Sequence, residues 1–127
     1  MDAEITPALR QAAHLMALAQ HLTRHSHLVP VDVTRGSEPA HQLRTRREFA
    51  ARDLVAWSDS LSEPSVSVRA IGYEAYVEVS GETSATRVLA WTTVPGFLDY
   101  LGWKSGEETR SVAVGELRAF AVAQEVA

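Results

Sequence analysis

A strict alternation of side-chain type between Tyr73 and Ser80 constrains the fold of this chain more than any other feature. Every second residue is apolar or aromatic, in the order Tyr73, Ala75, Val77 and Val79. Successive side chains of a β-strand point to opposite faces of a sheet, so the pattern predicts a strand with one buried face. Similar alternations precede it at Val66–Ala70 and follow it at Arg87–Trp91. The stretch Ser65–Val94 therefore predicts three antiparallel strands in sequence.

The turns between these strands suggest how the strands pair. Gly72-Tyr73 is typical of a two-residue type II′ turn, because glycine adopts a positive φ without steric cost. That turn predicts three cross-strand pairs: Ala70 with Ala75, Val68 with Val77, and Val66 with Val79. A second, looser turn at 81–84 predicts the pairs Val77 with Val88 and Ala75 with Ala90, which would place Glu78 opposite Arg87.

The second face of this sheet has an unusual composition for a face exposed to water. Solvated faces are normally polar, whereas this one mixes aromatic, aliphatic and charged side chains: Arg69, Ile71, Glu74, Tyr76, Glu78, Arg87, Leu89 and Trp91. Two interpretations remain open. Either the C-terminal segment packs over this face, or the face is a contact surface of the kind that exposed apolar patches mark.

Helices are expected on both sides of this region. Thr6-Pro7 predicts a helix start, with Thr6 as N-cap and Pro7 at the first helical position, and the amphipathic pattern continues to about His25. Residues 97–101 predict one helical turn that Gly102 ends, and residues 111–126 predict a final helix, although 112–114 also suit an extended conformation. Val29, Val31 and Val33 around Pro30 suggest a short edge strand.

Residues 40–61 allow two interpretations. Thr45 and Glu48 have the spacing of a capping box, which predicts a strand over 40–44 and a helix over 46–61. Alternatively, one helix begins near Pro39. Either way, a buried face is expected to include Phe49, Leu54, Trp57 and Leu61. We prefer the capping box, and the chain then predicts a single α+β domain over 1–127, with an antiparallel sheet and helices packed on one face.

Composition excludes several classes of function. The chain has 127 residues and no cysteine, so disulfides, thiolate metal sites and cysteine nucleophiles are absent. The net charge of −4 argues against a surface devoted to phosphate. No apolar run approaches the ~20 residues needed to cross a bilayer. No secretory signal pattern is recognisable at the N-terminus, which predicts a cytoplasmic location, in a bacterium or in a host cell.

Candidate catalytic and metal sites are weak. His21 and His25 have the i, i+4 spacing that can hold a metal, but no carboxylate is placed to join them. The sequence contains neither a serine nucleophile elbow nor a glycine-rich phosphate loop. We therefore expect no enzymatic activity, no cofactor and no metal.

Three segments, 53–61, 76–81 and 88–91, together resemble small helix-plus-sheet proteins of uncharacterised function from GC-rich actinobacteria and their phages. The resemblance extends over about residues 10–94 and lies in core and turn positions. It implies an α+β architecture and no particular activity.

These observations lead to a prediction of function. The chain is expected to bind a protein partner, or itself as a homo-oligomer, through a sheet face formed by Arg69, Tyr76, Arg87, Leu89 and Trp91. Aromatic residues and arginine are enriched where protein interfaces carry their energy. The alternative is single-stranded nucleic-acid binding by the same residues, with bases stacked on the aromatic rings.

Overall fold

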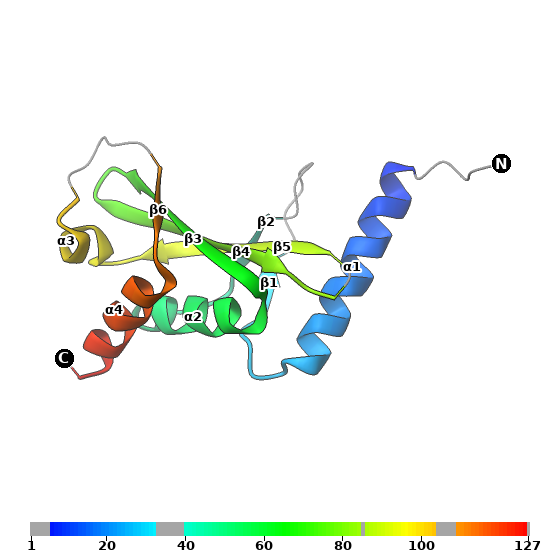
Figure 1. Cartoon of the computed structure of the whole chain (residues 1–127), viewed down its shortest axis with the longest axis horizontal. Helices are drawn as coiled ribbons and strands as arrows, with labels where there is room; N and C mark the ends of the chain where they lie inside the picture. Colours follow the sequence, from blue (N-terminus) through cyan, green and yellow to red (C-terminus); the bar gives the residue numbers. More distant parts are fainter. Residues whose placement is uncertain (1–5, 33–39, 85, 104–108, 127) are drawn as a thin grey trace.

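A computed structural model describes residues 6–32, 40–84, 86–103 and 109–126. Within these ranges the chain forms a six-stranded sheet with the order β1–β2–β5–β4–β3–β6 (Figure 1). The strands are β1 (Val31–Asp32), β2 (Ala40–Leu43), β3 (Ser62–Ile71), β4 (Glu74–Glu82), β5 (Arg87–Val94) and β6 (Arg110–Val112). The expected edge strand at Val29–Val33 is thus shorter, and Val33 lies outside the described residues.

The sheet is mixed, so the prediction of a purely antiparallel sheet is wrong. β2 runs parallel to β5, with Ala40 opposite Leu89 and Gln42 opposite Trp91. Parallel neighbours need a long crossover connection, and here it contains a helix and two further strands. Alternation within a strand reports which face a side chain occupies but carries no information on strand direction, which explains the error.

The first predicted register agrees with the structure and the second does not. Ala70 pairs with Ala75, and Gly72 adopts the positive φ of 62° that the turn requires. In the second hairpin Val77 pairs with Thr92 rather than Val88. A tight turn follows Glu82 directly, because the Thr83 amide donates to the Thr86 carbonyl at 2.8 Å. The shift is an even number of residues, so every side chain keeps its predicted face.

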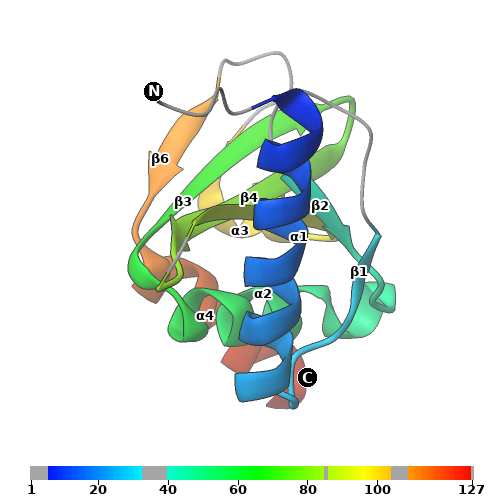
Figure 2. The ribbon, with the colours of Figure 1, turned by 90° about the vertical axis from the view of Figure 1, so that its right-hand side faces the viewer.

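The helices are α1 (Pro7–Arg24), the 3₁₀ turn η1 (Arg47–Phe49), α2 (Ala50–Ser60), α3 (Phe97–Leu101) and α4 (Val114–Val126). α2 and α4 lie side by side on one face of the sheet, as Figures 1 and 2 show. The Thr6 hydroxyl caps α1 by accepting from the Leu9 amide at 3.1 Å. None of the described helices combines the length and apolar character required to cross a membrane.

The predicted capping box at Thr45 is wrong. The Thr45 hydroxyl donates to the carboxylate of Asp53 instead, and η1 begins after Arg46 without a side-chain cap. Phe49, expected in the core, is exposed, and the Arg52 guanidinium lies 4.1 Å from the centre of its ring. A 3₁₀ turn has three residues per turn, so it places Phe49 differently from an α-helix.

The core fills the space between α2, α4 and the valine face of the sheet. That face presents small apolar side chains of β3, β4 and β5 that are almost fully buried: Val66, Val68, Ala75, Val77, Val79, Val88, Ala90 and Val94. Trp57 of α2 is 0% exposed, and its indole N–H donates to the Val29 carbonyl at 3.2 Å. Leu117 and Phe120 of α4 complete the layer.

Two interpretations were left open for the second sheet face, and within the described residues the C-terminal segment does not pack over it. β6 extends the sheet by pairing with β3, with Ser111 opposite Ser67. α4 then packs beside α2 on the valine face. The segment predicted as a final helix over 111–126 is therefore extended at its start, in β6, and helical from Val114 to Val126.

Candidate functional site

The face of the sheet that points away from α2 and α4 is termed the open face. All five residues predicted to bind, Arg69, Tyr76, Arg87, Leu89 and Trp91, lie on it by strand alternation. The register places Tyr76 opposite Arg69 on β3 and opposite Thr93 on β5. Arg87 and Leu89 lie at the start of β5, next to the turn that joins it to β4.

Tyr76 and Trp91 are brought together as a stacked pair on this face. Their ring centres are 4.2 Å apart with an interplanar angle of 21°. Trp91 lies directly opposite Glu78, so the pair is a diagonal contact between β4 and β5, within the reach of large side chains. Both residues are only half-buried, in contrast to Trp57 and Trp103. The stack thus leaves aromatic surface on the open face accessible to solvent.

Charges of both signs surround the stack. β4 carries Glu74, Glu78 and Glu82 on the open face, while Arg69 and Arg87 lie on its two neighbours. Arg87 lies 3.5 Å from the Glu82 carboxylate and donates to the Ser80 hydroxyl at 3.2 Å. Burial raises the pKa of Tyr76, an effect that nearby Arg69 partly opposes, so the phenol stays protonated at neutral pH.

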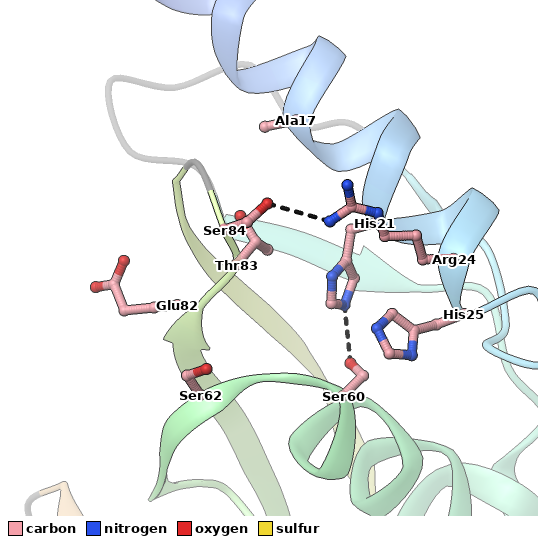
Figure 3. Close-up of a pocket in the computed structure, with 9 residues that line it drawn as sticks. All are labelled: Ala17, His21, Arg24, His25, Ser60, Ser62, Glu82, Thr83 and Ser84. Atoms are coloured by element: carbon pink, nitrogen blue, oxygen red, sulfur yellow. Dashed lines mark hydrogen bonds between the residues drawn. The ribbon is translucent and has the colours of Figure 1, made fainter.

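A small pocket of about 100 Å³ lies between α1, the end of α2 and the β4–β5 turn (Figure 3). It is lined by Ala17, His21, Arg24, His25, Ser60, Ser62, Glu82, Thr83 and Ser84. The His21 ring reaches Ser60 Oγ at 2.9 Å, and Arg24 donates to the Ser84 hydroxyl at 3.4 Å.

The hydrogen bonds of Ser60 do not favour nucleophilic catalysis in this pocket. Its hydroxyl donates to the Trp57 carbonyl at 2.7 Å, so it accepts from His21 Nε2–H. A catalytic histidine needs the opposite arrangement, in which the imidazole accepts the hydroxyl proton. His21 instead serves as a buried tether between α1 and α2.

The pocket also does not favour a particular ion. Among the described residues, no three His, Asp or Glu side chains are placed to share a metal ion. Arg24 opposes a cation, whereas Glu82 and the carbonyl ends of α1 and α2 oppose an anion. His21 and His25, whose i, i+4 spacing could have held a metal, have ring centres 4.5 Å apart. Side chains four residues apart on a helix are neighbours in any case, so this proximity alone does not indicate a metal site.

A second pair of histidines was not recognised from the sequence. His14 of α1 and His41 of β2 place their Nε2 atoms 2.8 Å apart, and His14 Nδ1 lies 3.3 Å from the Thr86 hydroxyl. Burial lowers the pKa of both imidazoles, and His14 lowers that of His41 further. The two residues belong to different elements, so no local spacing could have indicated the contact.

Comparisons of this chain with protein-family profiles, curated proteins and solved structures find no match.

Proposed function

We propose that this protein is a non-enzymatic interaction protein that binds a protein partner, and first of all a second copy of itself, through the open face. The observation that carries the proposal is the stacked, half-exposed Tyr76–Trp91 pair on the face opposite α2 and α4. Rings of this kind supply large apolar contact area and rigid anchors, and they are enriched among the residues that dominate interface energies.

The dimensions of the open face suit a protein partner. β3, β4 and β5 have 10, 9 and 8 residues. At ~3.3 Å per residue and ~4.8 Å per strand, these three strands present roughly 30 Å by 15 Å, and the shorter β2 and β6 extend the face at its edges. That area is more than half of the ~800 Å² that each partner buries in an interface of standard size.

The arrangement of charge favours a second copy as the partner. Three glutamates lie along β4, and one arginine lies on each of the two neighbouring strands. A two-fold axis through the face can place Arg69 of one copy against the glutamates of the other, while Arg87 pairs with Glu82 within each copy. Such an interface is self-complementary, as two-fold dimers require, and opposite charges across it fix the orientation of the partners.

The test is the molar mass in solution, measured by light scattering as a function of concentration. We expect the wild type to reach the mass of a dimer, and we expect the double variant Tyr76→Ser, Trp91→Ser to weaken association by tenfold or more, because both anchors are removed. Tyr73→Ser serves as the control, since Tyr73 is 95% exposed at the β3–β4 turn and is not part of the stack. Unchanged mass and unchanged partner capture in the double variant would refute the proposal.

The alternative is single-stranded nucleic-acid binding, which the exposed Arg69 and Arg87 beside the aromatic pair favour. The glutamates of β4 oppose it, and each ring already uses one of its faces to stack on the other. Titration of tryptophan fluorescence with an oligonucleotide separates the two functions. Nucleic-acid binding predicts saturable quenching and an affinity that falls steeply with salt, whereas the interaction protein gives neither response.

A further inference from the structure

Helix α1 is held to the rest of the protein along only part of its length. Residues 6–13 are exposed, and the buried residues of the helix are Ala17, Leu18 and His21. Figure 2 shows α1 crossing the end of the sheet rather than lying within the α2 and α4 layer. A helix with so little buried apolar area depends strongly on its polar contacts for its position.

Histidines provide several of these polar contacts. The Nε2 atoms of His14 and His41 are hydrogen-bonded at 2.8 Å, and the ring centres are 5.1 Å apart. His14 also reaches Thr86 in the β4–β5 turn. The pair thereby connects α1 to β2 and to the end of the β4–β5 hairpin.

A second histidine contact lies two turns further along α1. His21 is 6% exposed and is bonded to Ser60 at the end of α2. Its ring centre lies 5.8 Å from that of the fully buried Trp57. Buried imidazoles in such surroundings favour the neutral form, because burial in a low-dielectric medium penalises charge.

We infer that α1 is held by a proton-sensitive latch, consisting of His14, His21 and His41 with the hydroxyls of Thr86 and Ser60, and that mild acidification releases the helix. The inference does not depend on the function proposed for the open face.

The chemistry of the imidazole explains the release. A hydrogen bond between two Nε2 atoms requires a proton on one nitrogen and a free lone pair on the other. When both rings are protonated, two N–H groups and two positive charges face each other at 2.8 Å. The bond is then replaced by repulsion, which separation of α1 from β2 relieves.

The direction of the pH dependence follows from the surroundings of the three imidazoles. Burial lowers the pKa of all three; His25 and Arg24 lower that of His21 further, and His14 that of His41. In the released helix the imidazoles regain an ordinary pKa of about 6.5. The released form therefore binds more protons below that pH. Below that pH, the equilibrium constant for docking of α1 falls by up to about tenfold per pH unit for each proton taken up. Above the ordinary pKa, protonation does not weaken docking.

The neighbouring charges do not compensate for protonation of the latch. On α1 the cationic neighbours are Arg10, one turn before His14, and Arg24, beside His21. One carboxylate, that of Glu82, lines the pocket beside His21, and it is paired with Arg87. None of the ion pairs found within the described residues involves His14, His21 or His41. An imidazolium formed in the latch thus meets cations or a carboxylate that is already engaged.

The absence of cysteine permits a direct measurement of the helix position. Spin labels are placed at the exposed residues Gln11 of α1 and Ser111 of β6 through Gln11→Cys and Ser111→Cys, and labelled protein is diluted with unlabelled chain. Electron–electron distance measurements from pH 7.5 to pH 5 are expected to show one narrow distance at neutral pH and a broad distribution at the acid end. A distance unchanged to pH 5 would overturn the inference.

Two further variants identify the groups responsible. The triple variant His14→Gln, His21→Gln, His41→Gln keeps side-chain hydrogen-bonding groups but cannot titrate, so its distance should stay narrow at pH 5. His27→Gln, at an exposed position beyond the latch, should release as the wild type does. Release of the triple variant only on acidification would refute the assignment. If α1 is released in the triple variant at every pH, histidine NMR of the wild type provides the test. The inference then requires that His14, His21 and His41 take up protons over the same pH range in which the helix is released, and protonation outside that range would refute it.

Discussion

Replacing Trp57 with alanine is expected to lower the free energy of unfolding by about 3–5 kcal/mol. Trp57 is 0% exposed, lies in α2 against the valine face, and donates its indole N–H to Val29. The substitution leaves a cavity and an unsatisfied carbonyl, and a domain of this size has only about 5–15 kcal/mol of stability in total. Urea unfolding followed by far-UV circular dichroism measures the change.

The matched control is Trp91→Ala on the opposite face of the same sheet. Trp91 is half-buried and its ring faces solvent beside Tyr76, so its removal should cost only about 1 kcal/mol, a value common for point variants. Both variants are compared at dilute protein, because association through the open face would add stability of its own. Equal losses for Trp57 and Trp91 would contradict the difference between the two faces.

Replacing Gly81 with alanine is the second substitution expected to have a large effect. A Cβ at Gly81 would lie 2.7 Å from the Leu61 Cβ and 2.9 Å from the Ser62 carbonyl oxygen. Neither atom belongs to the flexible end of a side chain, so β4 and the start of β3 would have to separate. We expect a loss of about 1–3 kcal/mol, the usual cost of overpacking, measured by the same urea unfolding.

Gly115→Ala is the control for this prediction. The added methyl group meets no atom within 4 Å, and the position lies within α4. Alanine favours a helix over glycine by up to about 1 kcal/mol, so this variant should be as stable as the wild type or more stable. A Gly81→Ala protein with wild-type stability would show that β3 and β4 do not approach as closely as the structure indicates.

Features determined by neighbouring residues were predictable from the sequence. The alternation from Glu74 to Ser80 indicated correctly which side chains share a face, and Gly72 indicated the first hairpin and its register. Tyr73, predicted on the buried face with Ala75, lies instead in the β3–β4 turn and is 95% exposed, because the two-residue turn takes it out of the strand. Thr6-Pro7 marked the start of α1. Each of these features depends on the steric and hydrogen-bonding preferences of a few adjacent residues, which the sequence displays directly.

Features determined by distant residues were not predictable. The parallel pairing of β2 with β5 joins segments on either side of α2 and the first hairpin, and no local pattern encodes it. The second register depended on where the turn closes, and the Thr83–Thr86 hydrogen bond closes it two residues later along the chain than the predicted turn at 81–84. The His14–His41 contact likewise exists only because tertiary packing brings α1 to the end of the sheet.

The candidate site shows the same division. Strand alternation predicted that Arg69, Tyr76, Arg87, Leu89 and Trp91 share one face, and the structure places them there. The stacking of Tyr76 on Trp91 depends on the register of β4 and β5. Under the predicted register Arg87 would have faced Glu78, whereas it lies opposite Glu82 and leaves the position opposite Glu78 to Trp91.

The accessibility of Trp91 in dilute solution tests most directly the claim that one sheet face is covered by helices and the other is open. The three tryptophans are labelled as 5-fluorotryptophan, and each ¹⁹F resonance is assigned with a Trp→Phe variant and exposed to a soluble paramagnetic relaxation agent. We expect strong broadening for Trp91, which diminishes as rising concentration promotes association, and little broadening for the buried Trp57 and Trp103. A Trp91 signal as protected as that of Trp57 at every dilution would show that the chain covers this face itself.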